Sequence, residues 1–176
     1  MKPAPTMLAS CARAATAAEA RFRVDYPNAR PHVARIFALD APAAEAMRRV
    51  AAVEPWQGAA FLTFRSPTAG AAGLDALPVD ATLTTLAGDT VGLSDSLRDV
   101  DVAVMIATAG ESAAAAETIG NACFVRAIMT TGLVVGRGAQ RGAVERTIRS
   151  LRPFAAMLVI ATGEDYIPEM LAALRV

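Results

Sequence analysis

The sequence predicts an α/β fold with one largely parallel sheet, and three observations support this prediction. From His32 to the end of the chain, short apolar runs alternate with segments of helical periodicity, which is typical of a β-α-β succession. Residues 102–107 are continuously apolar, as expected for a central strand that is covered on both faces. The chain has 176 residues, of which 54% are hydrophobic. One domain with its own core can therefore form, and intrinsic disorder is excluded for most of the length.

Three strands are predicted in the first half of the chain, at residues 33–39, 59–64 and 81–86. A helix begins at Ala41 after the first strand, because Pro42 suits the first helical turn and the apolar residues that follow lie on one face. The turn-rich residues 66–78 after the second strand indicate a surface loop. The third strand alternates less regularly and is expected at the sheet edge, before a short helix capped by Ser94 or Asp95.

Three further strands are predicted in the second half, at residues 102–107, 133–135 and 156–161. A long helix is predicted at 112–130, with Gly132 as its stop signal. The residues expected on its buried face are Ile119, Cys123, Phe124 and Ile128. The next helix, at 140–151, carries an apolar stripe and ends before Pro153, and a last helix spans 167–174.

Two segments are expected along the chain. Residues 1–30 are rich in alanine and arginine and are interrupted by prolines, so they are expected to form an N-terminal arm or a peripheral helix. Residues 31–176 are expected to form a single Rossmann-like domain, in which a doubly wound, mostly parallel six-stranded sheet lies between two helical layers as a three-layer sandwich. We expect an alanine-rich helical face of this domain to mediate assembly into a homo-oligomer.

Charge and cysteine content exclude several classes of protein. Lys+Arg and Asp+Glu both count 17, so no net field would draw the chain to nucleic acid or to an anionic membrane. Cys11 and Cys123 lie far apart, and His32 is the only histidine, which excludes a zinc framework and a disulfide scaffold. The apolar runs are shorter than the roughly 18 to 20 residues of a membrane span. We expect a cytoplasmic protein with neither nucleic acid nor membrane as partner.

Candidate ligand-binding residues follow the predicted strands. In open doubly wound sheets the ligand lies beyond the carboxyl ends of the strands, where the strand order reverses. If the six strands are ordered 3-2-1-4-5-6, this crevice lies between Asp40 and the turn at 108–112. Glycines there would let a ligand approach the backbone, and arginine and hydroxyl groups would supply donors. The predicted ligand-binding residues are Asp40, Thr108, Gly110, Glu111, Ser112, Gly136, Arg137, Gly138, Thr162 and Glu164.

The same residue types also suit helix capping, so a purely structural interpretation stays open. An acidic residue in a first helical turn offsets the helix macrodipole and satisfies free amides. Carboxylates at these turns argue against a phosphate beside them, because they would repel it. As a further alternative, Asp40, Glu111, Glu164 and Asp165 could converge on Mg²⁺ or Ca²⁺, although their spacing does not itself indicate a metal site.

Catalytic residues are not apparent. His32 precedes a strand and therefore lies at the opposite end from the expected crevice. Cys123 belongs to the buried face of a helix, which is typical of a small core residue rather than a reactive thiol. The sequence pairs no nucleophile with a base, and it identifies no cofactor.

Residues 94–170 resemble the nucleotide-binding half of the tubulin/FtsZ-like GTPases in the order of their elements. The stretch Leu-Arg-Asp-Val-Asp-Val-Ala-Val-Met-Ile-Ala-Thr-Ala-Gly at 97–110 is similar to the strand that enters the phosphate loop of that family. Where the family has a loop rich in glycine and threonine, this chain has Gly110 followed by Glu111, so the resemblance implies a degenerate nucleotide site. The turn at 109–112 is also similar to the phosphosugar loop of SIS-type isomerase domains.

These observations together predict a small-ligand or degenerate nucleotide-binding domain without an evident catalytic constellation. Two alternatives stay open. One is an enzyme that acts on a phosphorylated small molecule through the strand-end Gly-Glu turns. The other is a structural or assembly subunit whose alanine faces pack against other copies.

Overall fold

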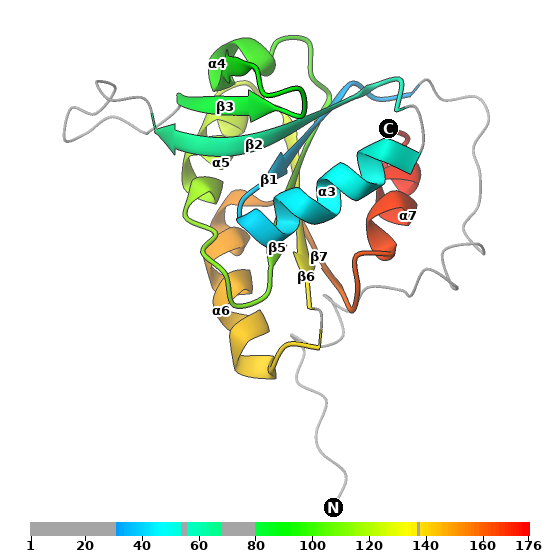
Figure 1. The fold of residues 1–176 in the computed structure, drawn as a ribbon. Coiled ribbons are helices and arrows are strands. Elements are labelled where there is room, and N and C mark those ends of the chain that lie inside the picture. Colours follow the sequence, from blue (N-terminus) through cyan, green and yellow to red (C-terminus); the bar gives the residue numbers. More distant parts are fainter. Residues whose placement is uncertain (1–30, 54–55, 68–79, 137) are drawn as a thin grey trace, which may run out of the picture.

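The structure is a computed structural model and describes residues 31–53, 56–67, 80–136 and 138–176. Within these residues, seven strands form one sheet in the order β4-β3-β2-β1-β5-β6-β7 (Figure 1). The strands are β1 (Ala34–Ala38), β2 (Ala59–Pro67), β3 (Ala81–Thr85), β4 (Thr90–Gly92), β5 (Val102–Thr108), β6 (Met129–Val135) and β7 (Met157–Ala161). Strands β1, β2, β5, β6 and β7 are parallel, whereas β3 and β4 form an antiparallel hairpin beside β2. The predicted α/β class with a mostly parallel sheet is confirmed.

Helices pack on both faces of this sheet (Figure 1). The described helices are α3 (Ala41–Val53), α4 (Leu93–Ser96), α5 (Ala115–Phe124), α6 (Arg141–Leu151) and α7 (Tyr166–Ala173), with a 3-10 turn η1 (Arg152–Phe154) after α6. One core cluster joins Ile36 of β1 to α3 and α7, and the other joins Phe37 to α4, α5 and α6. Neighbouring residues of one strand serve opposite cores because side chains alternate along a strand. This arrangement is compatible with a Rossmann-like fold.

The sheet has one strand more than the six predicted. Strand β4 has only three residues, so no alternating pattern could reveal it. It pairs with β3 and takes the edge position, and β3 is therefore not the edge strand that the sequence predicted. Helix α4 starts directly after β4 with Gly92 as its N-cap, and the Asp80 carboxylate accepts a hydrogen bond from the Ser94 amide in its first turn at 3.2 Å. The predicted capping by Ser94 or Asp95 is wrong, since both residues lie inside the helix.

The predicted helix 112–130 is too long. Helix α5 spans Ala115–Phe124, and the chain reverses at Ala127, which has a φ of 54°. Strand β6 begins at Met129 and contains Gly132, the residue predicted to stop the helix. Phe124 is 79% exposed rather than buried, because it lies at the last turn of the shortened helix. The predicted burial of Ile119 and Cys123 is confirmed.

Several predictions fall on residues outside the described ranges. These concern the N-terminal arm at 1–30, most of the loop at 66–78, and Arg137. Among the described helices, none is long and apolar enough to cross a membrane. The remaining predicted strands agree with the structure to within a few residues at their ends. They lie in the order 3-2-1-4-5-6 on which the expected crevice was conditional, with β4 added outside β3.

Candidate functional site

The predicted site residues gather at one edge of the sheet. Asp40 follows β1, Thr108 ends β5, Gly136 follows β6 and Thr162 follows β7. Because these strands are parallel and adjacent, their carboxyl ends open at the same edge. Strand β1 lies between β2 and β5, so the chain changes direction across the sheet at the gap between β1 and β5.

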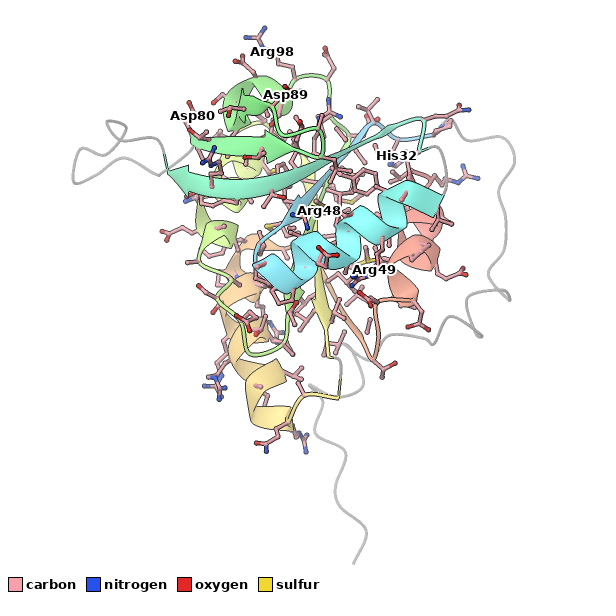
Figure 2. The ribbon with its side chains drawn as sticks, viewed as in Figure 1. His32, Arg48, Arg49, Asp80, Asp89 and Arg98 are labelled. Atoms are coloured by element: carbon pink, nitrogen blue, oxygen red, sulfur yellow. The ribbon has the colours of Figure 1, made fainter. Side chains whose placement is uncertain are left out.

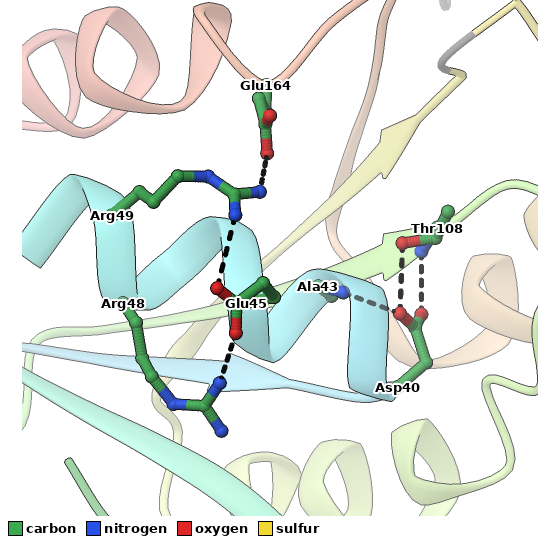
Figure 3. A network of polar contacts seen from close by, with 7 residues as sticks. All are labelled: Asp40, Ala43, Glu45, Arg48, Arg49, Thr108 and Glu164. Carbon is green, nitrogen blue, oxygen red and sulfur yellow. Dashed lines mark hydrogen bonds and ion pairs between the residues drawn. The ribbon is translucent and has the colours of Figure 1, made fainter.

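Asp40 closes this gap by binding Thr108 on the neighbouring strand (Figure 3). Its Oδ2 accepts a hydrogen bond from the Thr108 amide at 2.6 Å, and its Oδ1 accepts one from the Thr108 hydroxyl at 2.9 Å. Oδ1 also accepts a hydrogen bond from the Ala43 amide at 2.7 Å, which caps the start of α3. Both carboxylate oxygens are thus satisfied within the protein. The geometry favours the structural role of Asp40 over direct ligand contact.

The turn after β5 is held by a hydrogen bond to α6, and two of its side chains are exposed. Gly110 has a φ of 94°, a left-handed conformation that favours glycine, and its amide donates to the Thr147 hydroxyl of α6 at 3.0 Å. Glu111 and Ser112 are exposed. The Glu111 carboxylate has no hydrogen-bond or ion-pair partner among the described residues, whereas the Ser112 hydroxyl is 3.5 Å from the Ala114 amide. These two side chains are available to a ligand.

The two glycines of the turn after β6 differ in role. Gly136 is buried, and its amide donates to the Ala161 carbonyl at 2.7 Å. A Cβ at this position would lie 3.1 Å from that carbonyl oxygen, so glycine permits the close approach of two strand ends. Gly138 is exposed with a φ of 74° and open space around it. The following helix α6 has no side-chain cap, because its N-cap residue Gln140 makes no such bond.

Glu164 in the turn after β7 also has a partner within the protein. Its Oε2 accepts a hydrogen bond from Arg49 of α3 at 2.7 Å, and Arg49 contacts Glu45 as well (Figure 3). The hydrogen bond that Arg49 donates to Glu164 raises the pKa of Arg49 above its ordinary value. The pair is solvent-exposed, so it stabilises the fold only slightly. Thr162 beside it is exposed.

The described residues supply no metal site. No group of three or more His, Cys, Asp or Glu residues in the described ranges could hold a metal ion. Asp40 and Glu164 are engaged with Thr108 and Arg49 respectively. The alternative in which the strand-end carboxylates converge on Mg²⁺ or Ca²⁺ is therefore wrong for the part of the chain that the structure describes.

Neither titratable nucleophile candidate among the described residues suits catalysis. Cys123 is completely buried, and burial raises the pKa of its thiol to about 12. It therefore stays protonated near neutral pH, and a thiol is a poor nucleophile. His32 lies before β1 at the opposite edge of the sheet, where its amide donates to the Arg175 carbonyl at 2.7 Å (Figure 2).

A feature that the sequence did not reveal lies at the other end of β1. Arg35 lines a pocket of about 270 Å³ between β1, β2, β3, β4 and α4. The other lining residues include Ala60, Leu62, Val91, Asp95 and Ser96. The signal in the sequence is an arginine inside the apolar run 33–39, but the pocket also depends on β4 and on the true start of α4, which sequence patterns missed.

Comparison with known proteins adds no family to this description. No protein-family model matches the chain, and no curated protein matches it significantly.

Proposed function

We propose that this chain is a doubly wound, Rossmann-like domain that binds a small ligand at the carboxyl edge of its sheet without catalysing a reaction. The five parallel strands follow the order β2-β1-β5-β6-β7, and helices cover both faces. In sheets of this kind, ligands bind outside the carboxyl ends of the strands beside the strand where the order reverses. Here that strand is β1.

One observation carries the proposal. Exposed polar groups form a rim above the closed Asp40–Thr108 pair, from three loops that leave the same edge. The rim comprises Gly110, Glu111, Ser112, Gly138 and Thr162, whereas the predicted ligand residue Arg137 lies outside the described residues. Asp40, Thr108, Gly136 and Glu164 hold the loops in position rather than face the ligand.

A nucleotide-like molecule is the ligand class that this rim favours. The Glu111 carboxylate can accept a hydrogen bond from a sugar hydroxyl or from an amine of a base, and it would repel a phosphate. An anionic group would instead lie near Gly138 and the uncapped start of α6, where free amides and the helix dipole attract it. The resemblance to GTPases with an altered phosphate loop agrees with this division.

The test is a thermal-shift screen of the purified chain against GTP, ATP, NAD(P), flavins and sugar phosphates. A ligand that binds the native state raises the melting temperature by mass action. We expect a shift with one class, reduced in Ser112→Ala and in Arg137→Ala. The control Arg149→Ala, an exposed arginine on α6, should keep the shift.

Two outcomes would reject the proposal. If no ligand class shifts the melting temperature, the carboxyl edge is not a ligand site. The other outcome is that the ligand is converted to product on incubation with the wild-type chain, and more slowly with Ser112→Ala. The protein would then be an enzyme that acts through the strand-end turns.

A second candidate function, an assembly subunit, is favoured by exposed apolar side chains. Phe124 and Val125 at the end of α5 are 79% and 55% exposed. Met129 and Met157, the first residues of the neighbouring strands β6 and β7, are also exposed. The alanines of α3 and α5 do not form the contact face, because most are buried in the core. If a second copy covers this surface, Phe124→Asp should convert a dimer to a monomer in sedimentation. The matched change Val53→Asp, at an equally exposed residue of α3, should not.

A further inference from the structure

Arg35 is a charged residue in the middle of the sheet. It is the second residue of β1 and pairs with Ala60 of β2 on one side and with Ala103 of β5 on the other. Its neighbours Ala34 and Ile36 are completely buried, and Arg35 itself is half-buried. A guanidinium held away from water costs free energy unless an anion or several acceptors compensate it.

The protein compensates Arg35 incompletely. Its Nε donates to the Ser96 carbonyl at 2.7 Å, and its Nη1 donates to the Ala34 carbonyl at 3.0 Å. A guanidinium has five N–H donors, so these two bonds leave three without a partner among the described residues. No described carboxylate forms an ion pair with Arg35. Burial lowers the pKa of Arg35, in agreement with a charge that has lost water without gaining an anion.

The space beside this guanidinium is the pocket of about 270 Å³. A water molecule occupies roughly 30 Å³ of the liquid, so a space of this size is that of about nine waters and admits a small molecule with a similar number of non-hydrogen atoms. Ala60, Leu62 and Val91 give it an apolar wall. Asp95 also lines the pocket, but its carboxylate is 72% exposed and accepts a hydrogen bond from Arg98 at 2.8 Å.

We infer that this pocket is a second ligand site, which binds a small monocarboxylate with a short apolar group. The carboxylate would accept the unused donors of Arg35 in charge-assisted hydrogen bonds, and the apolar group would cover Ala60, Leu62 and Val91. The site is separate from the proposed rim. Arg35 lies three residues before the end of β1, or about 10 Å at 3.3 Å per residue, and none of the rim loops lines the pocket.

A purely structural role for Arg35 explains less. The bond to Ser96 supplies a donor to the last residue of α4, where carbonyls lack helical partners. A neutral donor could do the same. A structural role therefore does not explain why a charged residue lies beside an apolar pocket. It also does not explain why three of its donors are unused.

The experiment is a titration of the full chain with benzoate and with hexanoate, followed by amide chemical shifts in nitrogen–proton correlation spectra. The probes have nine and eight non-hydrogen atoms, and benzamide and hexanamide are their neutral counterparts. We expect saturable binding of at least one acid, and at least tenfold weaker binding of its amide. The shifted resonances should belong to residues around the pocket, such as Leu62 and Val91.

Three variants separate the charge, the cavity and general effects. Arg35→Met keeps a long unbranched side chain without the charge and should weaken binding at least tenfold. Ala60→Ile keeps Arg35 and occupies part of the pocket beside it, and it should weaken binding to the same extent. Arg149→Met removes an exposed arginine on α6 and should leave binding unchanged.

Any of three results would overturn the inference. These are the absence of saturable binding of either acid to the wild-type chain, equal binding of acid and amide, and undiminished binding by a folded Ala60→Ile variant. The last result holds even if Arg35→Met fails to fold. Because the probes and variants differ from those of the carboxyl-edge screen, either site can fail without the other.

Discussion

The two ends of β1 carry opposite charges, and they differ in how fully the protein satisfies the hydrogen bonds of the charged group. At the carboxyl end, Asp40 accepts three hydrogen bonds, and both of its oxygens are occupied by Thr108 and Ala43. Near the amino end, Arg35 donates two hydrogen bonds and leaves its remaining donors beside a pocket. Asp40, a predicted ligand contact, therefore joins two strands and a helix start, whereas Arg35 inside an apolar strand keeps unused donors beside a pocket.

The same contrast extends to neighbouring strands. At the carboxyl edge, the amide of Gly110 binds Thr147 and Glu164 binds Arg49. Toward the amino end, the buried Nδ1 of His32 and the buried hydroxyl of Thr131 lack partners among the described residues. A third such atom, the Thr84 hydroxyl, lies on the antiparallel strand β3. The polar groups named at the carboxyl edge hold loops together. In the other half of the sheet, bonded groups such as the Thr130 hydroxyl stand beside buried ones without a described partner.

The largest effect is expected at Asp40. The change Asp40→Ala removes an N-cap, worth about 1 kcal/mol, and two hydrogen bonds to a carboxylate, worth about 1.5 kcal/mol each. The free energy of unfolding should therefore fall by about 4 kcal/mol in total. Asp40→Asn keeps one acceptor oxygen and should lose about half as much. Urea denaturation followed by circular dichroism measures both.

Asp89→Ala is the matched control, because Asp89 is exposed in the turn between β3 and β4 and its carboxylate has no described partner. Its unfolding free energy should change by less than about 0.5 kcal/mol. If Asp40→Ala were no more destabilising than Asp89→Ala, Asp40 would not be a structural tie, and a role in ligand contact would be favoured again.

The sequence predicts those parts of this fold whose pattern is local. The apolar run at 102–107 corresponds to β5, and the amphipathic stripe at 140–151 corresponds to α6. Strand β4 escapes prediction because three residues carry no period. The start of β6 escapes because Ile128 continues the helical pattern, whereas the chain reverses at Ala127 and the Ile128 amide binds the Cys123 carbonyl.

The candidate site also has one part that local sequence patterns predict and one part that they do not. That Asp40 and Thr108 lie at one edge follows from their places after two strands. Their pairing joins residues 68 apart in the sequence and depends on which strands are neighbours. The Arg35 pocket depends on β4 and α4, so no local pattern could indicate it.

The hydroxyl of Thr108 provides a smaller test of the carboxyl edge. Thr108→Val removes the hydrogen bond to Asp40 Oδ1 and keeps the one from the amide, so we expect a loss of about 1.5 kcal/mol in unfolding free energy. The exposed Thr162→Val at the same edge should have little effect. Equal effects of the two substitutions in urea denaturation would show that the Asp40–Thr108 hydroxyl bond contributes nothing.

Thr131 tests the opposite half of the sheet, where the expected sign is reversed. Its hydroxyl is buried without a described partner, so Thr131→Val replaces an unsatisfied group by a methyl of similar shape. We expect stabilisation by about 1 kcal/mol, which raises the melting temperature by roughly 2 to 4 °C. The adjacent Thr130→Val should destabilise instead, because the Thr130 hydroxyl accepts a hydrogen bond from the Ala156 amide at 3.1 Å. A loss of stability in Thr131→Val would reveal a partner for that hydroxyl.

The smallest effect on stability is expected at Arg35, although it carries a charge in a central strand. Arg35→Met leaves the Ser96 carbonyl without its donor, which costs about 1 kcal/mol. It also removes a half-buried charge without an ion-pair partner, which offsets part of that cost because water still screens the guanidinium. The net change in unfolding free energy should stay within about 0.5 kcal/mol, as is usual when an apolar side chain of similar volume replaces a buried charge. A loss of more than about 2 kcal/mol in urea denaturation would mean that Arg35 is as firmly integrated as Asp40, and the contrast between the two ends of β1 would disappear. A nearly neutral change, together with lost carboxylate binding, would mean that Arg35 serves a ligand rather than the fold.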